Sequence, residues 1–229
     1  MGNILSFSGG KDSTAMLHLM LERSEQIDGV FYCDMGDWEF PEMSDHISLV
    51  EEKTGVHINR IVLPDLTYIA FQHTYELKNG TKKRYGWPSV KRRWCTGIKQ
   101  NELIKVQRKY KHSVPCVGLA LDEIKRKKHT NVRYPLIEYG YTEEMCLDYC
   151  KKLGYHWNGL YNWQKRVSCW CCPLQGLQNL KALRKNRPEL WEKLMEWDQL
   201  DSNYRFKYKN VGVFELEARF AAEDIHKGE

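Results

Sequence analysis

Residues 2–14 read Gly2-Asn3-Ile4-Leu5-Ser6-Phe7-Ser8-Gly9-Gly10-Lys11-Asp12-Ser13-Thr14. The run up to Phe7 is short and apolar, and apolar residues recur at helical spacing after Thr14, so the stretch predicts a strand, a glycine-rich turn and a helix. Paired glycines let backbone N–H groups approach phosphate oxygens closely, and the dipole of the following helix favours an anion. The stretch therefore predicts a phosphate-binding loop.

The spacing of this loop differs from that of two common nucleotide-binding motifs. It is neither the dinucleotide fingerprint G-x-G-x-x-G nor the Walker loop with its four residues between the glycine and the Gly-Lys pair. Ser8 and Ser13 add hydroxyl donors, and Lys11 adds a positive charge. On the local string alone, the alternative is a glycine-rich turn that binds nothing.

Further strands and helices are expected along the chain in alternation. Apolar runs predict strands at 30–33, 58–63 and 113–119, and helical spacing predicts helices near 43–50, at 97–110 and from Thr142 to Leu153. Gly55 can terminate the first of these helices, and Thr142 can cap the last. This alternation predicts a mainly parallel sheet covered on both faces. Residues 64–94 lack clear periodicity and are expected to form an irregular insertion.

The last third of the chain is expected to be helical. Helices are predicted at 174–186 and 188–200, with Pro188 in a first helical turn, followed by an irregular polar stretch at 201–213 and a closing helix at 214–225. We expect a nucleotide-binding domain over residues 1–173 and a helical extension packed on it over 174–229.

Composition is that of an ordinary globular protein. The 229 residues include 35 Lys and Arg against 30 Asp and Glu, a net charge of +5, and 42% hydrophobic residues, which argues against disorder or a collagen-like repeat. No apolar run approaches the roughly 20 residues that cross a bilayer, and the chain starts without a basic leader region. We therefore expect a cytoplasmic protein with no membrane association.

Eight cysteines divide into two groups. Cys33, Cys116, Cys146 and Cys150 stand among apolar neighbours and are expected to be buried core thiols. The remaining cysteines include a C-x-x-C pair, whose spacing recurs in zinc and iron–sulfur sites but also in redox pairs or buried clusters. This second group is Cys95, Cys169, Cys171 and Cys172.

The string SGGKDS resembles the PP-loop of the ATP pyrophosphatase superfamily. Asp34-Met35-Gly36 with Phe40-Pro41-Glu42, and Gly118 to Glu123 with Arg126, resemble segments of its phosphoadenosine phosphosulfate (PAPS) reductase-like family, as do Tyr134 to Ile137 and Gly159-Leu160-Tyr161. The resemblance covers roughly residues 1–200, and the chain is identified as similar to the DNA-phosphorothioation ATP pyrophosphatase type.

This resemblance implies an α/β fold of the adenine-nucleotide alpha-hydrolase-like type, with a doubly wound, mainly parallel sheet and a helical C-terminal cap. It implies that ATP and Mg²⁺ bind here and that Lys11, Asp12 and Ser13 are catalytic. Lys11 would neutralise the leaving pyrophosphate, and Asp12 would orient the loop or bind Mg²⁺. The implied nucleotide-binding residues are Ser6, Ser8, Gly9, Gly10, Lys11, Asp12, Ser13, Thr14, Asp34, Met35, Gly36, Gly118 and Arg126.

Arg93-Trp94-Cys95 and the segment around Cys169 to Pro173 resemble those that hold a [4Fe–4S] cluster in several members. Cys95, Cys169 and Cys172 are then three implied ligands. Either Cys171 is the fourth, or the fourth iron stays open and carries a sulfide. Zn²⁺ is the alternative metal, because four thiolates suit its tetrahedral geometry.

Two departures from the family pattern bear on the activity. Leu119 stands where an arginine is common, so part of the anion binding is expected from Lys125, Arg126 or residues 91–93. The final residues lack the cysteine that PAPS reductases carry there, which favours an ATP pyrophosphatase that adenylylates an acceptor for sulfur transfer.

The alternatives are a PAPS or adenylylsulfate reductase and a non-catalytic nucleotide-binding subunit of a modification or defence complex. The expected partners of the preferred activity are a nucleic-acid acceptor and a cysteine desulfurase that donates sulfur. The basic residues at 82–93 are either a nucleic-acid contact or a solvated loop. The sequence gives no indication of the oligomeric state.

Overall fold

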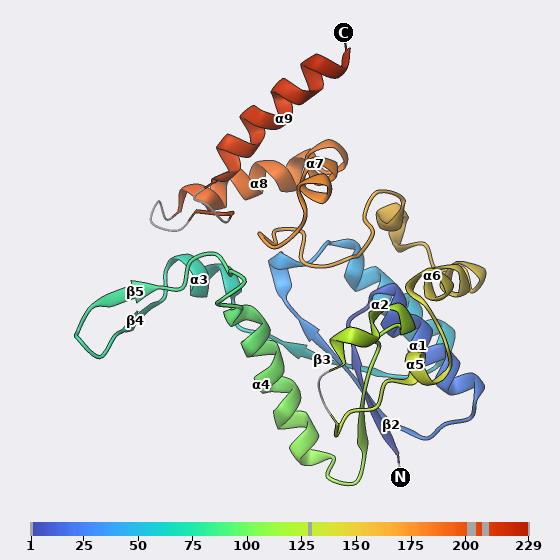
Figure 1. The fold of residues 1–229 in the computed structure, drawn as a ribbon. Coiled ribbons are helices and arrows are strands. Elements are labelled where there is room, and N and C mark those ends of the chain that lie inside the picture. Colours follow the sequence, from blue (N-terminus) through green and yellow to red (C-terminus); the bar gives the residue numbers. More distant parts are fainter. Residues whose placement is uncertain (1, 128–129, 201–204, 208–210, 229) are drawn as a thin grey trace. The chain divides into compact units, whose positions relative to one another are not determined.

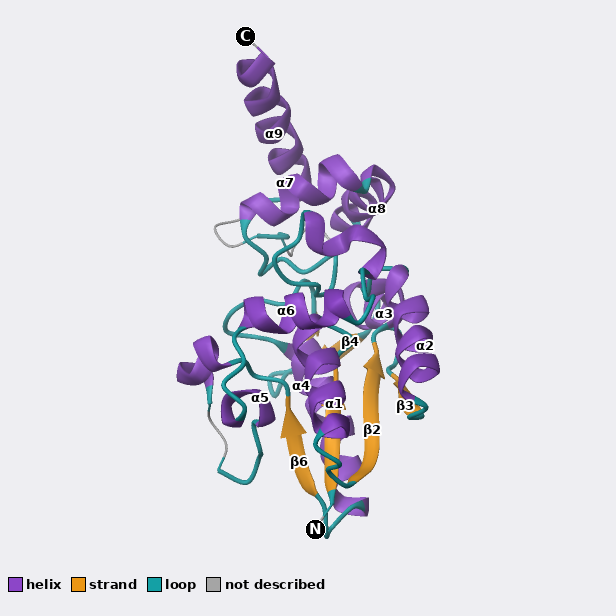
Figure 2. Ribbon diagram, turned by 90° about the vertical axis from the view of Figure 1, so that its right-hand side faces the viewer, coloured by secondary structure: helices purple, strands orange, loops and turns teal. Residues whose placement is uncertain are grey.

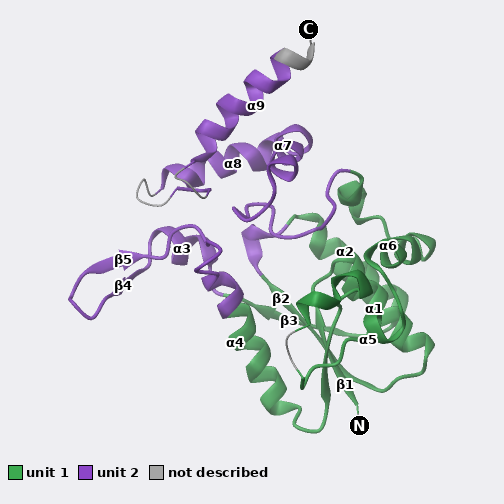
Figure 3. Cartoon of the chain, viewed as in Figure 1, with its two compact units in different colours: residues 1–34, 40–63, 98–162 green, residues 35–39, 64–97, 163–229 purple. Residues whose placement is uncertain are grey.

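The structure is a computed structural model, and it describes residues 2–127, 130–200, 205–207 and 211–228. Its chain divides into two compact units, shown in Figure 3. Unit 1 comprises residues 1–34, 40–63 and 98–162, and unit 2 comprises residues 35–39, 64–97 and 163–229. Both units are therefore built from separated segments, and the domain boundary expected at residue 173 stays a prediction.

Unit 1 is built on a sheet of four parallel strands in the order β3-β2-β1-β6. The parallel direction is visible for β2 and β6 in Figure 2. At its centre, Leu5 pairs with Val30 on one side and with Cys116 on the other. The expected α/β fold with a parallel sheet is confirmed. The strands are β1 (Asn3–Phe7), β2 (Ile27–Asp34), β3 (Ile58–Val62) and β6 (Val114–Val117).

Helices cover both faces of this sheet, as the alternation predicts. The helices α1 (Lys11–Glu22) and α2 (Glu42–Thr54) lie on one face of the sheet, and α4 (Trp94–Lys109) lies on the other (Figure 1). Crossovers between parallel strands are right-handed, and the connection from β3 to β6 through α4 runs across the sheet in the opposite direction to the other two. Strand order reverses between β1 and β6, which is the position where doubly wound sheets bind ligands.

Local signals set the ends of several elements. Gly55 ends α2 in the left-handed conformation, at a φ of 66°. The Thr142 hydroxyl accepts the Met145 N–H at 3.3 Å and caps α6 (Glu143–Lys152). Both caps are as predicted. The remaining elements of unit 1 are the short helix α5 (Pro135–Glu138) and the 3₁₀ segments η2 (Leu121–Arg126) and η3 (Trp157–Asn162).

Unit 2 shows that the expectation of an irregular stretch over residues 64–94 is partly wrong. This stretch contains α3 (Leu66–Phe71) and an antiparallel hairpin of β4 (Thr74–Glu76) and β5 (Lys82–Arg84). These elements are six and three residues long, too short for a period to be detected.

Helices make up most of the rest of unit 2. They are α7 (Leu177–Asn186), α8 (Pro188–Gln199) and α9 (Val213–Gly228), with the 3₁₀ turn η1 (Gly36–Trp38) from the earlier segment. Pro188 stands in the first turn of α8, as predicted. Most of the stretch predicted to be irregular at 201–213 lies outside the described residues. Among the helices of the described residues, we find none with the length and apolar character needed to cross a bilayer.

Tryptophans form the core of unit 2. Trp38 is 1% exposed, and its ring centroid lies 5.5 Å from that of Trp94 and 6.5 Å from that of Trp197. Trp197 in turn packs against Trp170 at 5.1 Å. These contacts join three separate segments of the chain, two of which carry the cysteines of the second group.

Candidate functional site

The phosphate loop of unit 1 runs from Ser8 to Gly10, between β1 and α1. Gly9 has a φ of +73°, and a Cβ there would lie 2.5 Å from the Met43 side chain, so only glycine fits this turn. Inside the loop, the Ser13 hydroxyl lies 3.1 Å from that of Ser8 and donates to the Gly10 carbonyl at 3.0 Å. Gly10 precedes α1 without a side-chain cap, which leaves the start of the helix suited to an anion.

Three residues that the sequence patterns do not indicate hold this loop in place. Tyr161, in η3, accepts the Lys11 N–H at 2.8 Å, and Trp157 donates its indole N–H to the Gly9 carbonyl at 2.7 Å. His46 lies 3.1 Å from the Thr14 hydroxyl, and burial lowers its pKa to about 3, so it is neutral at physiological pH. Of these residues, only Tyr161 stands in a segment quoted for the family resemblance, and no sequence pattern indicates its contact with the loop.

Gly118, at the end of β6, packs against the backbone of the loop. A Cβ at this position would lie 3.1 Å from Cα and N of Ser13 and 3.2 Å from the carbonyl carbon of Asp12. The glycine therefore allows β6 to approach the first turn of α1. The structure thus places Gly118, one of the residues expected to bind nucleotide, beside the loop.

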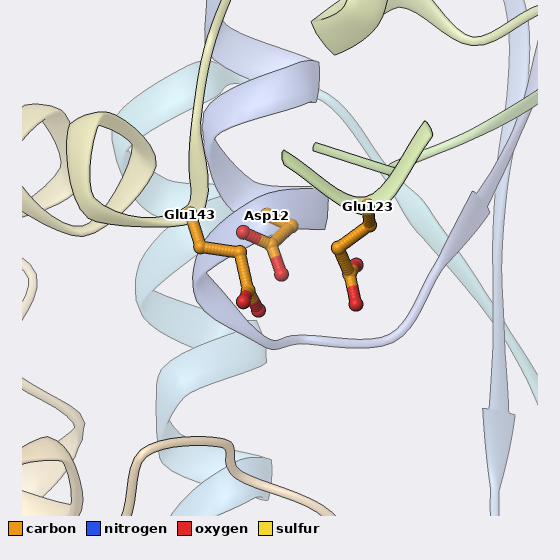
Figure 4. A group of neighbouring side chains, drawn as sticks. All are labelled: Asp12, Glu123 and Glu143. Atoms are coloured by element: carbon orange, nitrogen blue, oxygen red, sulfur yellow. The ribbon is translucent and has the colours of Figure 1, made fainter. Parts of the chain in front are cut away.

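Carboxylates from three elements converge at the start of α1. Oxygens of Asp12, Glu123 and Glu143 lie within 4.8 Å of one another, and Figure 4 shows the three side chains directed toward a common space. They come from α1, η2 and α6 respectively. Burial raises the pKa of Asp12, against the lowering effect of Lys11. This group of atoms matches the oxygen ligands that Mg²⁺ prefers.

Lys11 neutralises part of this charge. Its ammonium lies 2.7 Å from Asp12 and 3.1 Å from Glu143, and its side chain is only 6% exposed. From the sequence, we expect the Lys11 charge to act on a phosphate, whereas in the structure it pairs with carboxylates. Glu123 and Glu143 are not among the predicted site residues: Glu123 stands in the segment quoted for the family resemblance, and Glu143 follows the cap of α6 as a favourable acidic residue.

A cavity of about 580 Å³ lies in unit 1 between the sheet and α4. Ser6 and Arg126, both predicted to bind nucleotide, line it together with Phe31, Leu119 and Tyr134. Arg126 is also paired with Glu123 of the carboxylate group. The cavity volume falls within the 300 to 1,000 Å³ typical of small-ligand sites.

The predicted nucleotide-binding segment Asp34-Met35-Gly36 is divided between the units. Asp34 is the last residue of β2 in unit 1, whereas Met35 and Gly36 belong to unit 2. The Met35 sulfur lies 3.5 Å from the Cys169 sulfur. In the structure, Met35 is therefore a neighbour of the cysteine group of unit 2.

The four cysteines of the second group all belong to unit 2, and the structure brings them near one another. Cys171 is fully buried; burial raises the pKa of its thiol well above the ordinary value, and Cys169, Cys172 and Cys95 raise it further. Burial also raises the pKa of the Cys172 thiol. A hydrogen bond from the Leu174 N–H and the charges of Lys207 and Arg93 act in the opposite direction and lower it. Several thiolates cannot share such a place without a cation, so the donors are either protonated or bound to metal.

The tryptophans explain how these cysteines meet. Trp94 precedes Cys95, Trp170 stands between Cys169 and Cys171, and both rings are part of the tryptophan core. Trp170 also donates its indole N–H to the Asp37 carbonyl at 2.8 Å. The core therefore fixes both cysteine segments in unit 2.

A single metal ion and an iron–sulfur cluster require different distances between the sulfurs that bind them. Within the described part of the chain, the cysteine sulfurs form no group of three within 4.8 Å. Tetrahedral Zn²⁺ with bonds of about 2.3 Å would hold its sulfurs about 3.8 Å apart. A four-iron cluster binds each thiolate through a different iron and so needs a wider set.

The first group of cysteines is buried, as predicted. Burial raises the pKa of Cys116 and of Cys146 to about 12, so both stay protonated at neutral pH. Cys150 has its pKa raised by burial as well, and its thiol contacts the Lys11 carbonyl at 3.4 Å. These thiols fill the core and have no character of metal ligands.

Comparison with known proteins identifies the family. The model of the phosphoadenosine phosphosulfate reductase domain matches residues 2–175. The chain belongs to this family. The PAPS reductase family is one of enzymes, and its nucleotide-binding fold agrees with the parallel sheet and flanking helices of unit 1. A curated relative, an uncharacterized protein of Methanocaldococcus jannaschii, is 26% identical to this chain over 239 residues. The alignment covers 91% of this chain and 43% of the relative's length. This PAPS reductase family member thus spans less than half the length of that relative.

Proposed function

We propose that this PAPS reductase family member is an ATP pyrophosphatase that adenylylates an acceptor for sulfur transfer to nucleic acid. The observation that carries the proposal is the carboxylate group of Asp12, Glu123 and Glu143 at the phosphate loop. With Lys11 included, the group has a net charge of −2 when all three acids are ionised, which would repel a polyphosphate. A divalent cation removes this repulsion, and Mg²⁺ binds through carboxylates together with substrate phosphates.

This observation supports ATP over a sulfonucleotide as the substrate. Breaking the α–β bond of ATP expels pyrophosphate, whose charge Mg²⁺ stabilises as a Lewis acid. Attack of a thiol on the sulfur of PAPS leaves an adenosine bisphosphate and has no such requirement. A set of three carboxylates at the loop therefore favours ATP.

The residues of unit 1 have separate roles in this reaction. The backbone of Ser8 to Gly10 and the uncapped start of α1 would hold the pyrophosphate part, and the cavity lined by Ser6 and Arg126 would hold the adenosine. Asp12, Glu123 and Glu143 would hold Mg²⁺. Lys11 would then be released from Asp12 and Glu143 and could contact the phosphate, which is its predicted role.

The reaction balances as two displacements. An acceptor oxygen attacks the α-phosphorus, the bond to the β-phosphate breaks, and pyrophosphate leaves with the electron pair. A sulfur nucleophile then attacks the activated acceptor, and AMP leaves. Sulfide as the nucleophile gives the thiolated acceptor and AMP with no change of oxidation state. A desulfurase persulfide would instead join the acceptor to the desulfurase through an S–S bond, and a second thiol would cleave that bond, release the thiolated acceptor and be oxidised to a disulfide with the desulfurase cysteine.

We propose a [4Fe–4S] cluster at the cysteines of unit 2, with Cys95, Cys169 and Cys172 as ligands. When bound, such a cluster would supply sulfide or electrons. No three cysteine sulfurs of the described residues lie within 4.8 Å of one another, and this supports a cluster over Zn²⁺, whose sulfur ligands would be about 3.8 Å apart. Cys171 is either the fourth ligand or a buried thiol next to an open iron. Trp170 and Trp94 would keep the donors in place.

Nucleotide binding tests the first part of the proposal without knowledge of the acceptor. Calorimetric titration with ATP should show affinity at least tenfold higher with Mg²⁺ than with EDTA. Glu143→Gln should abolish this Mg²⁺ effect, whereas Glu144→Gln, an exposed neighbour on the same helix, should retain it. Tighter binding of PAPS than of ATP, independent of Mg²⁺ and accompanied by thiol-dependent sulfite release, would instead establish the reductase.

Metal analysis tests the second part. Protein purified without oxygen should be brown, absorb near 400 nm and contain about four iron and four sulfide per chain. A colourless protein with one zinc and no iron would contradict the cluster. A cluster-loaded protein that binds ATP but releases no pyrophosphate with any nucleic-acid acceptor and desulfurase would be the non-catalytic subunit.

A further inference from the structure

We propose that the β4–β5 hairpin and the segment after it, residues 72–93, bind the phosphodiester backbone of a nucleic acid. The biological reason for this binding rests on the proposed function, because the surface would hold the nucleic-acid acceptor. The binding itself is inferred from the charge and the structure of the hairpin.

Positive charge is concentrated in this segment. Residues 72–95 contain seven Lys and Arg and one acidic residue, Glu76, giving a net charge of 7 − 1 = +6, while the whole chain has +5. The rest of the chain is therefore close to neutral, at 5 − 6 = −1. A local field of this sign attracts and steers polyanions. The basic residues are Lys78, Lys82, Lys83, Arg84, Lys91, Arg92 and Arg93.

Most of these charges are exposed and have no carboxylate partner among the described residues. Lys78, Lys82, Lys83, Lys91 and Arg93 are exposed, and none of the five is ion-paired with a carboxylate of another described residue. By contrast, Lys181, a half-buried cation of unit 2, is paired with Asp224 at 2.8 Å. Lysines without a protein partner can exchange their counterions for phosphates, which is the main source of nucleic-acid affinity.

The hairpin presents these charges on a fixed backbone. Glu76 pairs with Lys82, Tyr75 with Lys83 and Thr74 with Arg84, and the Leu77 N–H closes the turn onto the Thr81 carbonyl at 2.9 Å. Gly80 takes a φ of +80° in this turn. Lys82 and Arg84 therefore share one face about 7 Å apart, a spacing of the order of that between successive phosphates of an extended strand.

Aromatic rings on the other face attach the second basic segment to the hairpin. The rings of Tyr75 and Tyr85 lie 4.9 Å apart, and the Arg92 guanidinium lies over them at 5.0 Å and 4.9 Å. Ser89 and Arg92 exchange two backbone hydrogen bonds of 3.1 Å. These contacts fix residues 89–92 beside the hairpin, on the face that also carries Lys83, so the charges of the two segments lie close together. His73, exposed and 6.0 Å from Tyr85, adds an aromatic ring on which a base could stack.

This basic surface leads to the cysteine group. Arg93 stands two residues before Cys95, and Trp94 of the tryptophan core lies between them. Within unit 2, a phosphodiester held by residues 82–93 would thus reach the neighbourhood of the cysteines. A hairpin that only kept the protein in solution would not need to end there.

Binding is tested with 20-nucleotide labelled single-stranded RNA, single-stranded DNA and duplex DNA, by fluorescence anisotropy at 50 to 300 mM salt and without ATP. The test variant is Lys82→Ala/Lys83→Ala/Lys91→Ala. The matched control, Lys109→Ala/Lys111→Ala/Lys151→Ala, removes the same charge from exposed sites of unit 1. Circular dichroism checks that both fold.

We expect wild type and control to bind at least one of the three nucleic acids with affinities within threefold of each other. The hairpin variant should bind at least tenfold more weakly, and the slope of log K against log salt should fall by about 2 for a single strand, since three contacts are lost. Which oligonucleotide binds best identifies RNA or DNA as the source of the backbone.

Equal losses in both variants, or no binding by wild type at 50 mM salt, would overturn the assignment. So would stronger binding to vesicles with 30% phosphatidylserine than to any oligonucleotide. Because the assay contains neither ATP nor metal, failure of the Mg²⁺ or iron measurements leaves a positive result intact, and the proposed function can fail separately.

Discussion

Gly118→Ala is the substitution that tests most directly how the sheet supports the phosphate loop. The added methyl group would lie 3.1 Å from Cα and N of Ser13, atoms of the main chain that cannot rotate away. Ordinary contact begins near 3.4 Å, so β6 or the first turn of α1 must move by a few tenths of an ångström. Since the φ of Gly118 is outside the left-handed region, the cost is one of packing alone.

Overpacking of this kind costs about 1–3 kcal/mol. For a chain of this size, 1 kcal/mol corresponds to a fall in Tm of roughly 2–4 °C. The displaced start of α1 should also weaken ATP binding. The assays are urea unfolding followed by circular dichroism and calorimetric titration with Mg²⁺ and ATP.

Gly97→Ala is the matched control. Gly97 lies in α4, where a methyl group added at its Cα would have no atom within 4 Å, and alanine should raise stability by up to about 1 kcal/mol there. If Gly118→Ala unfolded within 0.3 kcal/mol of wild type and bound ATP normally, the close approach of β6 to the loop would not matter and the reasoning would be refuted.

Three further substitutions have distinct expected outcomes. The pKa of Asp12 is raised above its ordinary 3.8, chiefly by burial, so its contribution to stability is present below pH 3.8 and is lost at higher pH. Asp12→Asn should therefore raise the Tm at pH 7, with a smaller difference near pH 3, while losing Mg²⁺-dependent ATP binding; a lower Tm at pH 7 would contradict this. Thr142→Ala removes the cap of α6 and should cost about 1 kcal/mol in urea unfolding, and no change would show that the Met145 N–H is satisfied by water. Cys95→Ser should reduce bound iron roughly tenfold, whereas Cys146→Ser, a buried core thiol, should retain it; equal iron in both would remove Cys95 from the ligand set.

Most of the sheet could be predicted because its signals are local. The strands of unit 1 are apolar runs, and the glycine-rich turn directly follows the first of them. Gly55 ends a helix because it adopts the left-handed conformation, and Thr142 begins one because its hydroxyl caps the first turn. The buried state of Cys116 and Cys146 follows in the same way from apolar neighbours. Each of these features depends on a few consecutive residues.

The remaining features could not be predicted because they depend on residues that are far apart in the sequence and come together only in the folded chain. Asp12 is predicted from the phosphate loop, but Glu123 and Glu143 follow it by more than a hundred residues, and neither stands out as a metal ligand in its own segment. Tyr161 supports the loop through one hydroxyl from a 3₁₀ turn that has no periodicity. The hairpin escapes prediction because three residues per strand are too few for alternation to show.

The interleaving of the two units has a consequence for the synthesis of the chain. The polypeptide passes between them at residues 34, 39, 63, 97 and 162, so unit 2 lacks its last segment until the final third is made. Cys95 therefore emerges from the ribosome 74 residues before Cys169. Trp38, Trp87 and Trp94 meanwhile have no Trp170 or Trp197 to pack against. A metal centre bound as proposed could therefore be completed only after residue 172 has been translated.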